Sequence, residues 1–104
     1  MTFAPGDVVL AQAGTKRRPC VLLRVAADEV LVVVPGTGTE RDQPHVAVLL
    51  GSQAARAMRL DKSTYFYATV VRIRAAALHA TGGRCPPEIF QRIRELLGDV
   101  RPGA

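Results

Sequence analysis

A run of three cations, Lys16-Arg17-Arg18, is the first group in the sequence whose residue types could do chemistry. Pro19 follows directly and biases Arg18 toward an extended backbone, which fixes the direction of its side chain. Because guanidinium groups bind phosphate through paired hydrogen bonds, the run predicts a phosphate-binding corner. A solvated basic turn that prevents edge-to-edge strand pairing explains the same residues.

The glycine-rich stretch Pro35-Gly36-Thr37-Gly38-Thr39 is a second candidate. Glycines let a backbone approach a ligand closely, and two threonine hydroxyls can donate hydrogen bonds to phosphate oxygens. The stretch is not a P-loop, because the order GxxxxGK[ST] is missing. An ordinary irregular connection between two strands is the alternative interpretation.

A third candidate is the polar segment from Arg59 to Ser63, which leads into Tyr65, Phe66 and Tyr67. Aromatic rings of this kind can stack on the bases of single-stranded nucleic acid. They can equally fill a core or a dimer interface, and one face of an alternating strand must do so.

Other common catalytic patterns are missing from the sequence. His45 begins a predicted strand and His79 lies in a predicted turn, so we expect neither to act as a general acid or base. Cys20 and Cys85 lack metal-ligand or redox spacing and are predicted to be small buried hydrophobic residues, with a disulfide left open. The sequence therefore predicts no metal site and no cofactor.

Five short strands are predicted before a closing helix, from alternation and from β-branched residues. Between them, Pro35–Thr39 should be irregular, Gly82-Gly83 should form a sharp bend, and Gly51–Met58 fits either a helical turn or a loop. The expected strands are Val8–Ala11, Cys20–Ala26, Glu29–Val34, His45–Leu50 and Thr64–Ile73.

The predicted helix spans residues 86–97 and is the clearest element of the pattern. Two prolines open it, and Gly98 ends it before a tail over residues 98–104. Its apolar stripe consists of Ile89, Phe90, Ile93, Leu96 and Leu97. Such an order of elements indicates a small barrel or half-barrel with one helix.

Length and charge limit the possible classes of protein. The 104 residues fit one domain, 1–104, with a net charge of +5 carried mostly by arginine. No apolar run could cross a membrane and no leader peptide is evident, so we expect a cytoplasmic protein. A basic surface attracts polyanions, although a GC-rich genome would produce the same arginine bias.

Taken in order along the chain, these segments resemble the PemK/MazF family of toxins from bacterial toxin–antitoxin pairs. The matching segments are Pro5–Leu10, Arg18–Leu23, Val32–Pro35 with Thr37, Leu60–Ser63, Val71–Ile73 and Gly83–Leu97.

The resemblance implies a Src-homology-3-like barrel of about five antiparallel strands plus a C-terminal amphipathic helix, assembled as a homodimer. It implies a metal-independent endoribonuclease that cuts single-stranded RNA by attack of the ribose 2′-hydroxyl on the adjacent phosphate. Arg18 and Thr37 would then be catalytic. The expected substrate-binding residues are Lys16, Arg17, Thr39, Ser63, Tyr67 and Arg72.

One departure from the family pattern leaves an alternative open. Tyr67 and Thr69 stand where some members carry an arginine and an acidic residue that do acid–base work. A non-catalytic module that binds nucleic acid or protein, such as a degenerate toxin or a gyrase-type poison, is therefore the second hypothesis. For the toxin, the implied protein partner is an antitoxin with a disordered acidic segment.

Overall fold

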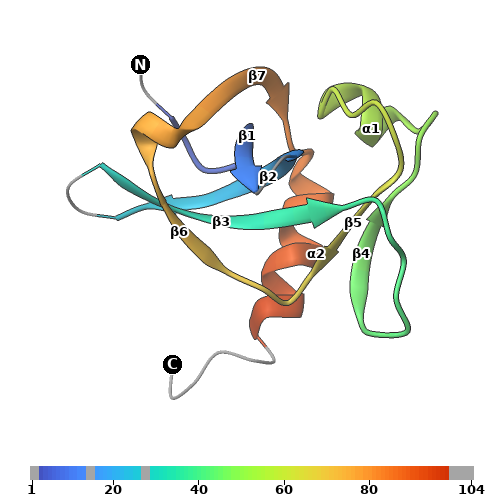
Figure 1. The fold of residues 1–104 in the computed structure, drawn as a ribbon. Coiled ribbons are helices and arrows are strands. Elements are labelled where there is room, and N and C mark those ends of the chain that lie inside the picture. The colour runs from blue at the N-terminus through green and yellow to red at the C-terminus, as the bar shows by residue number, and fades with distance from the viewer. Residues whose placement is uncertain (1–2, 14–15, 27–28, 99–104) are drawn as a thin grey trace.

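The computed structural model describes residues 3–13, 16–26 and 29–98. Its strands form a strongly curved antiparallel sheet, with a helix near the C-terminus packed against it (Figure 1). Residues 99–104 of the predicted tail lie outside the described residues, as do Ala27-Asp28 at the junction of the second and third predicted strands. In chain order the elements are β1 (Asp7–Ala13), β2 (Lys16–Val25), β3 (Val30–Thr37), β4 (His45–Val48), α1 (Gln53–Ala57), β5 (Thr64–Tyr67), β6 (Val71–Arg74), a 3₁₀ turn (Ala75–Ala77), β7 (Leu78–Arg84) and α2 (Pro87–Gly98).

The sheet order is β4-β5-β3-β2-β1-β7, with β6 paired to β3. Seven strands form in the described residues, against about five expected, yet the predicted fold class is confirmed: a small β-barrel with a C-terminal helix. One additional strand is β7, and the other arises because a predicted strand is divided.

Alternating side chains of the central strands supply two separate cores, one on each face of the sheet. Val8, Val21 and Val34 pack with the helices, whereas Val9 and Val33 belong to the opposite cluster. Period-two alternation accounts for this division, because neighbouring residues of a strand point to opposite faces. Both faces are covered, which explains why the central strands are nearly continuously apolar.

Helix α2 closes the first core much as the sequence predicts, with both ends shifted by one residue. Ile89 and Ile93 are its buried residues, and both belong to the cluster on the helix side of the sheet. Glu88 lies in the first turn, where its charge is favourable near the positive end of the helix dipole.

The expected strand Thr64–Ile73 is wrong, because the chain turns in its middle. β5 pairs with β4 and with the last residues of β3, whereas β6 pairs with Val30–Val33 at the other end of β3. The chain has to bend to reach both positions, and the N–H of Thr69 donates to the carbonyl of Tyr67 at 2.7 Å within that bend.

The expectation that Pro35–Thr39 is irregular is wrong over its first three residues, because β3 continues to Thr37. Pro35 pairs with Cys20 of β2, and Gly36 pairs with Phe66 of β5. Position 36 of this strand requires a glycine, because the neighbouring atoms leave no room for a Cβ, as described below.

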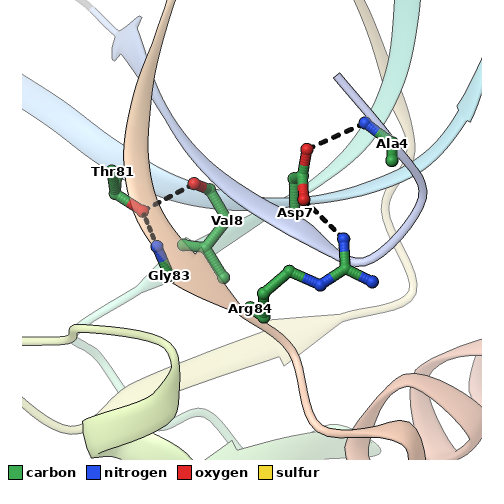
Figure 2. A network of polar contacts seen from close by, with 6 residues as sticks. All are labelled: Ala4, Asp7, Val8, Thr81, Gly83 and Arg84. Carbon is green, nitrogen blue, oxygen red and sulfur yellow. Dashed lines mark hydrogen bonds and ion pairs between the residues drawn. The ribbon is translucent and has the colours of Figure 1, made fainter. Parts of the chain in front are cut away.

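The expected bend at Gly82-Gly83 is instead an irregularity inside β7. Val8 pairs with Gly83 and Val9 with Ala80, so two residues of β7 are additional, as in a β-bulge. Gly82 accordingly has a φ of +81°. Figure 2 shows how Thr81 fixes this bulge: its hydroxyl donates to the carbonyl of Val8 at 2.7 Å and accepts from the N–H of Gly83 at 2.9 Å.

Helix α1 resolves the ambiguous segment Gly51–Met58 in favour of a helical turn. Ser52 is its N-cap, and the Ser52 hydroxyl accepts a hydrogen bond from the N–H of Ala55 at 3.1 Å. The carbonyl of Met58 then lies so close to β7 that a Cβ at Gly83 would be 2.4 Å from it. The short helix is thereby held against β7 (Figure 1).

Candidate functional site

The start of β2 and the end of β3 form the walls of a cleft of about 260 Å³. In the β2–β3 ladder Cys20 pairs with Pro35, so continuing that register by two residues places Arg18 opposite Thr37. Both residues line the cleft. The basic run and the glycine-rich stretch, separate in the sequence, therefore meet at one site.

The electrostatic character of the cleft is uniformly positive. Among its described lining residues, none carries a carboxylate or an imidazole, and the side chains that can form hydrogen bonds are cations and hydroxyls. Such a set suits a phosphate, which accepts hydrogen bonds on all its free oxygens. The lining residues are Lys16, Arg17, Arg18, Pro19, Gly36, Thr37, Gly38, Thr39, Lys62 and Thr64.

Gly36 forms the floor of the cleft because three elements converge on it. A Cβ at this position would be 2.4 Å from Cγ2 of Thr64, 2.9 Å from Cε1 of Phe66 and 3.1 Å from the carbonyl oxygen of Pro19. The lack of a side chain lets β2, β3 and β5 approach one another closely. Gly36 itself is buried, so its part in the site is to bring the ends of these strands together.

Two polar groups flank this floor. The hydroxyl of Thr37 accepts a hydrogen bond from the N–H of Thr39 at 3.3 Å, and a hydroxyl that accepts one bond can still donate another. The second is the ammonium of Lys62, whose Nζ lies 3.6 Å from the position that a Cβ of Gly38 would take. A phosphate seated here can meet a hydroxyl donor and an ammonium together.

Comparison with solved structures shows what the architecture is similar to. A chain from an endoribonuclease in complex with its cognate antitoxin, from a mycobacterial species, aligns with a TM-score of 0.73 at 17% identity, covering 94% of this chain and 93% of that one. A chain from the MazE–MazF complex of Deinococcus radiodurans aligns with a TM-score of 0.72 at 16% identity, covering 96% and 95%. The chain has a MazF-like fold. No protein-family model and no curated protein matches the sequence.

Within this MazF-like fold, five of the eight expected site residues surround the cleft. Lys16, Arg17 and Thr39 join Arg18 and Thr37 there. The other three expected residues, Ser63, Tyr67 and Arg72, do not line it.

Ser63 and Arg72 lie elsewhere in the fold. The hydroxyl of Ser63 accepts a hydrogen bond from the N–H of Leu50 at 2.9 Å, which ties the end of β4 to the segment before β5. Arg72 is exposed on β6 and pairs with Val32, near the other end of β3 from the cleft.

Tyr67 is buried and holds the loop that follows the cleft. Its hydroxyl donates to the carbonyl of Thr39 at 3.0 Å and accepts from the N–H of Arg41. The ring packs against His45 at a centroid distance of 5.2 Å, and the Arg41 guanidinium lies 5.5 Å above it. Tyr67 therefore positions a wall of the cleft rather than offering a face on which a base could stack.

The two histidines lie apart from the cleft lining. The Nδ1 of His45 is 2.6 Å from the carbonyl oxygen of Gln43, and its Nε2 is 3.3 Å from a carboxylate oxygen of Glu40. These contacts organise the β3–β4 loop, consistent with the structural role expected for His45. His79 is exposed on β7, opposite Leu10.

Two further residues of the cleft, Lys62 and Thr64, were not among those expected from the sequence. Lys62 belongs to the polar segment Arg59–Ser63, which the sequence marks as a candidate. The pairing of strands that brings Lys62 close to Gly38 is not visible in the sequence. Thr64 is almost fully buried, and its hydroxyl donates to the carbonyl of Lys62 at 3.1 Å. Thr64 thus fixes the backbone that carries the ammonium.

Both cysteines are free and buried, as expected for small hydrophobic residues. Burial raises the pKa of the Cys20 thiol to about 11, against a smaller lowering by the charge of Arg18. Burial and then the nearby Glu88 raise the pKa of Cys85 to about 12. Since the thiolate is the reactive form, burial disfavours nucleophilic chemistry at both cysteines.

The described residues offer neither a metal cluster nor a membrane-spanning helix. No group of three or more histidine, cysteine or acidic side chains is placed to hold a metal ion among them. None of the helices they form has the length and apolarity needed to cross a membrane.

Proposed function

We propose that this chain is the toxin component of a bacterial toxin–antitoxin pair and cleaves single-stranded RNA. The observation that carries the proposal is the convergence of Arg18 and Thr37 on one cationic cleft. The MazF-like fold supports it, because one similar structure is an endoribonuclease in complex with its cognate antitoxin.

The reaction that fits this cleft is an internal transfer at a phosphodiester. The ribose 2′-oxygen attacks the adjacent phosphorus, the bond from phosphorus to the 5′-oxygen breaks, and the products are a 2′,3′-cyclic phosphate and a 5′-hydroxyl. The intermediate carries two negative charges on its free oxygens. Arg18, Thr37 and Lys62 are arranged to stabilise that charge, because preorganised donors act most strongly where charge develops.

Two protons must also move, one from the 2′-hydroxyl and one to the leaving oxygen. The described lining of the cleft offers neither carboxylate nor imidazole for this task. The arginine side chain is already protonated at neutral pH and has no acceptor atom, so Arg18 stabilises charge and does not act as a base. In this proposal, water in the open cleft exchanges both protons with the substrate, and charge stabilisation supplies most of the rate.

The same proposal includes a homodimer and an antitoxin partner. Leu49 and Leu50 are 55% and 59% exposed, and Val70 and Val71 lie at the bend between β5 and β6 with 48% and 37% exposed. In this proposal, these four exposed apolar side chains pack against another protein chain. The net charge of +5 is complementary to the acidic segment expected of an antitoxin.

The test is cleavage of a mixed single-stranded RNA by the purified chain in the presence of EDTA, with the ends of the products identified. We expect cyclic phosphate and 5′-hydroxyl ends. Arg18→Ala should lower the rate by about 10²–10³, the usual loss for one positioned charge donor. Arg24→Ala is the matched control, since Arg24 is exposed on the same strand and does not line the cleft. Intact RNA under all conditions refutes the nuclease.

The absence of an acid–base pair from the described cleft lining favours one second candidate, a module that binds RNA without cutting it. This candidate predicts salt-sensitive RNA binding by the wild-type chain, with no cleavage product after long incubation. Arg18→Ala would then weaken binding, whereas in the nuclease it lowers the rate of cleavage as well.

A further inference from the structure

A second groove, of about 470 Å³, adjoins the cationic cleft. Arg17, Pro19 and Lys62 line both hollows, so the two share a wall. The groove extends from that shared wall toward β1, β7 and the segment that follows α1. Its remaining lining residues are Val8, Leu10, Arg59, Leu60, Asp61 and Thr81.

Arg59 is the unusual residue of this groove, because its backbone is left-handed, with a φ of +56°. It occupies the first position beyond the C-cap of α1. There the N–H of Arg59 donates to the carbonyl of Arg56 at 3.1 Å, and the N–H of Leu60 donates to the carbonyl of Ala55 at 2.9 Å. This pair of bonds is a Schellman motif, in which glycine is the favoured residue. An arginine here costs conformational energy, and such strain often accompanies function.

The side chain of Arg59 lies against the bulge of β7. Its Nη1 is 3.4 Å from the carbonyl oxygen of Thr81, and a Cβ on Gly82 would be 3.0 Å from the same nitrogen. The bulge itself is fixed by the two hydrogen bonds of the Thr81 hydroxyl (Figure 2). The guanidinium is therefore held at the groove by a rigid support, with other N–H donors left for a ligand.

The chemistry of the groove combines an apolar surface with an excess of positive charge. Leu10 and Leu60 are partly exposed in it, and three cations face one carboxylate, that of Asp61. A nucleotide is complementary to both features, since its base and ribose have apolar surface and its phosphate is an anion. Because the two hollows share Arg17, Pro19 and Lys62, one RNA strand that crosses this shared wall can occupy both.

We propose that this groove binds the nucleotide next to the one seated in the cleft, with Arg59 contacting its phosphate. The proposal rests on the RNA-cleaving function above and extends it to the path of the substrate. Arg59 is then a binding residue for flanking RNA, and its left-handed backbone directs the guanidinium toward the strand.

The decisive variant is Arg59→Gly, because structure and function should respond in opposite directions. Glycine suits the left-handed position, so the midpoint of thermal unfolding should stay equal or rise. The affinity for a longer single-stranded RNA, made uncleavable by a 2′-deoxy sugar at the scissile position, should fall about tenfold. The slope of log affinity against log salt should decrease by about 0.7, the value for one phosphate contact on a single strand.

Substrates of two lengths distinguish this proposal from the proposed function, because only a longer RNA reaches the second groove. The ratio of kcat/KM for the longer RNA to that for a dinucleotide of the same junction should fall in Arg59→Gly and in Arg59→Asn, a second residue tolerated in this conformation. Arg56→Gln is the matched control: this exposed arginine of α1 donates to the carbonyl of Gly51 at 2.8 Å and lines neither hollow.

Three results overturn the assignment, and each differs from failure of the nuclease, in which the wild-type chain cuts no RNA of any length. An unchanged ratio in both Arg59 variants excludes RNA from the groove. An equal decrease of the ratio in Arg56→Gln attributes the effect to general charge. Unchanged RNA binding with weaker binding of a polyglutamate peptide assigns the groove to an acidic protein segment instead.

Discussion

Arg84 and Arg18 show two opposite environments for arginine in one small chain. Nη1 of Arg84 is 2.5 Å from a carboxylate oxygen of Asp7, and the other oxygen of that carboxylate accepts the N–H of Ala4 at 2.8 Å (Figure 2). Arg18 lies instead among other cations, and no carboxylate is found in the described lining of its cleft.

Arg84 is neutralised by Asp7 and forms an internal contact between two strands. The charge of Arg18 has no carboxylate beside it in the described cleft lining and is available to a ligand. The Arg84 side chain is 60% exposed and that of Asp7 is 24% exposed, so their ion pair contributes at most about 1 kcal/mol to stability. The cations of the cleft repel one another, and a bound phosphate removes that repulsion. We therefore expect a bound phosphate to lower the repulsion among the cations of the cleft and to leave the Asp7–Arg84 ion pair unchanged.

The largest effect should come from charge reversal at these two arginines. Arg18→Glu and Arg84→Glu change the net charge equally, but only Arg18→Glu places a like charge against the phosphate. We expect Arg18→Glu to lower RNA affinity by more than about 100-fold, from the lost charged hydrogen bond and the added repulsion. Arg84→Glu should lower it by less than about tenfold, because Arg84 does not line the cleft and salt screens exposed charges that do not touch the ligand. Fluorescence anisotropy with uncleavable RNA measures both.

Equal losses in the two variants would mean that net charge, and not the geometry of the cleft, governs binding. That result would remove the distinction between the two regions. A circular-dichroism melt of each variant confirms that the comparison is made between folded chains.

A medium effect is expected from Gly36→Ala, which tests how closely the cleft floor is packed. The added Cβ would be 2.4 Å from Cγ2 of Thr64, a fully buried residue that cannot move aside. We expect the free energy of unfolding to fall by about 1–3 kcal/mol, as for other overpacked sites. Urea denaturation measures the change.

Two variants control for this effect. Gly38→Ala should be nearly neutral, because its Cβ would meet Lys62 at an ordinary 3.6 Å. Adding Thr64→Ser to Gly36→Ala removes the clashing methyl and should recover part of the loss. If the double variant is no more stable than Gly36→Ala, the close approach of β5 is not the cause.

The smallest effect should come from Tyr67→Phe, which keeps the ring but removes the hydroxyl. The carbonyl of Thr39 loses a donor and the N–H of Arg41 loses an acceptor, so unfolding should become easier by about 1–2 kcal/mol. Because Thr39 belongs to the cleft wall, KM for RNA should rise a few-fold while kcat changes less. Steady-state cleavage kinetics separate the two parameters.

Tyr65→Phe is the control for this prediction, since Tyr65 lies on the same strand and contacts His45 edge-on at 5.6 Å. It should change KM less than Tyr67→Phe does. A larger effect of Tyr65→Phe would show that the hydroxyl of Tyr65, and not the loop contact of Tyr67, affects RNA binding.

The elements that the sequence predicts well are those whose pattern is local. The stripe on α2 and the apolar strand after Pro19 are placed within a few residues, because helical and strand periodicity are properties of short segments. The expected strand over residues 64–73 failed for the opposite reason. Its β-branched residues suit any strand, and nothing local shows that its two halves pair with different ends of β3.

For the candidate site, the sequence marks out the residue types but not all of the positions. Arg18 and Thr37 are conspicuous because cations before a proline and hydroxyls between glycines are unusual. Tyr67 is equally conspicuous as an aromatic residue, yet its ring is buried and its hydroxyl binds a loop. Arg59 opens the polar segment that the sequence marks as a candidate, but its left-handed backbone appears only in the structure, where α1 ends.

By itself, the sequence determined the basic charge, the lack of metal-ligand spacing between the cysteines, the closing helix and the kinds of side chain offered to a phosphate. The tertiary structure decided which of these side chains share a cleft, because strand register brings together residues that are distant in the chain. It also decided which arginine is neutralised by a carboxylate and which is not. Coulomb interactions and hydrogen bonds depend on separation in space, and separation along the chain carries little information about it.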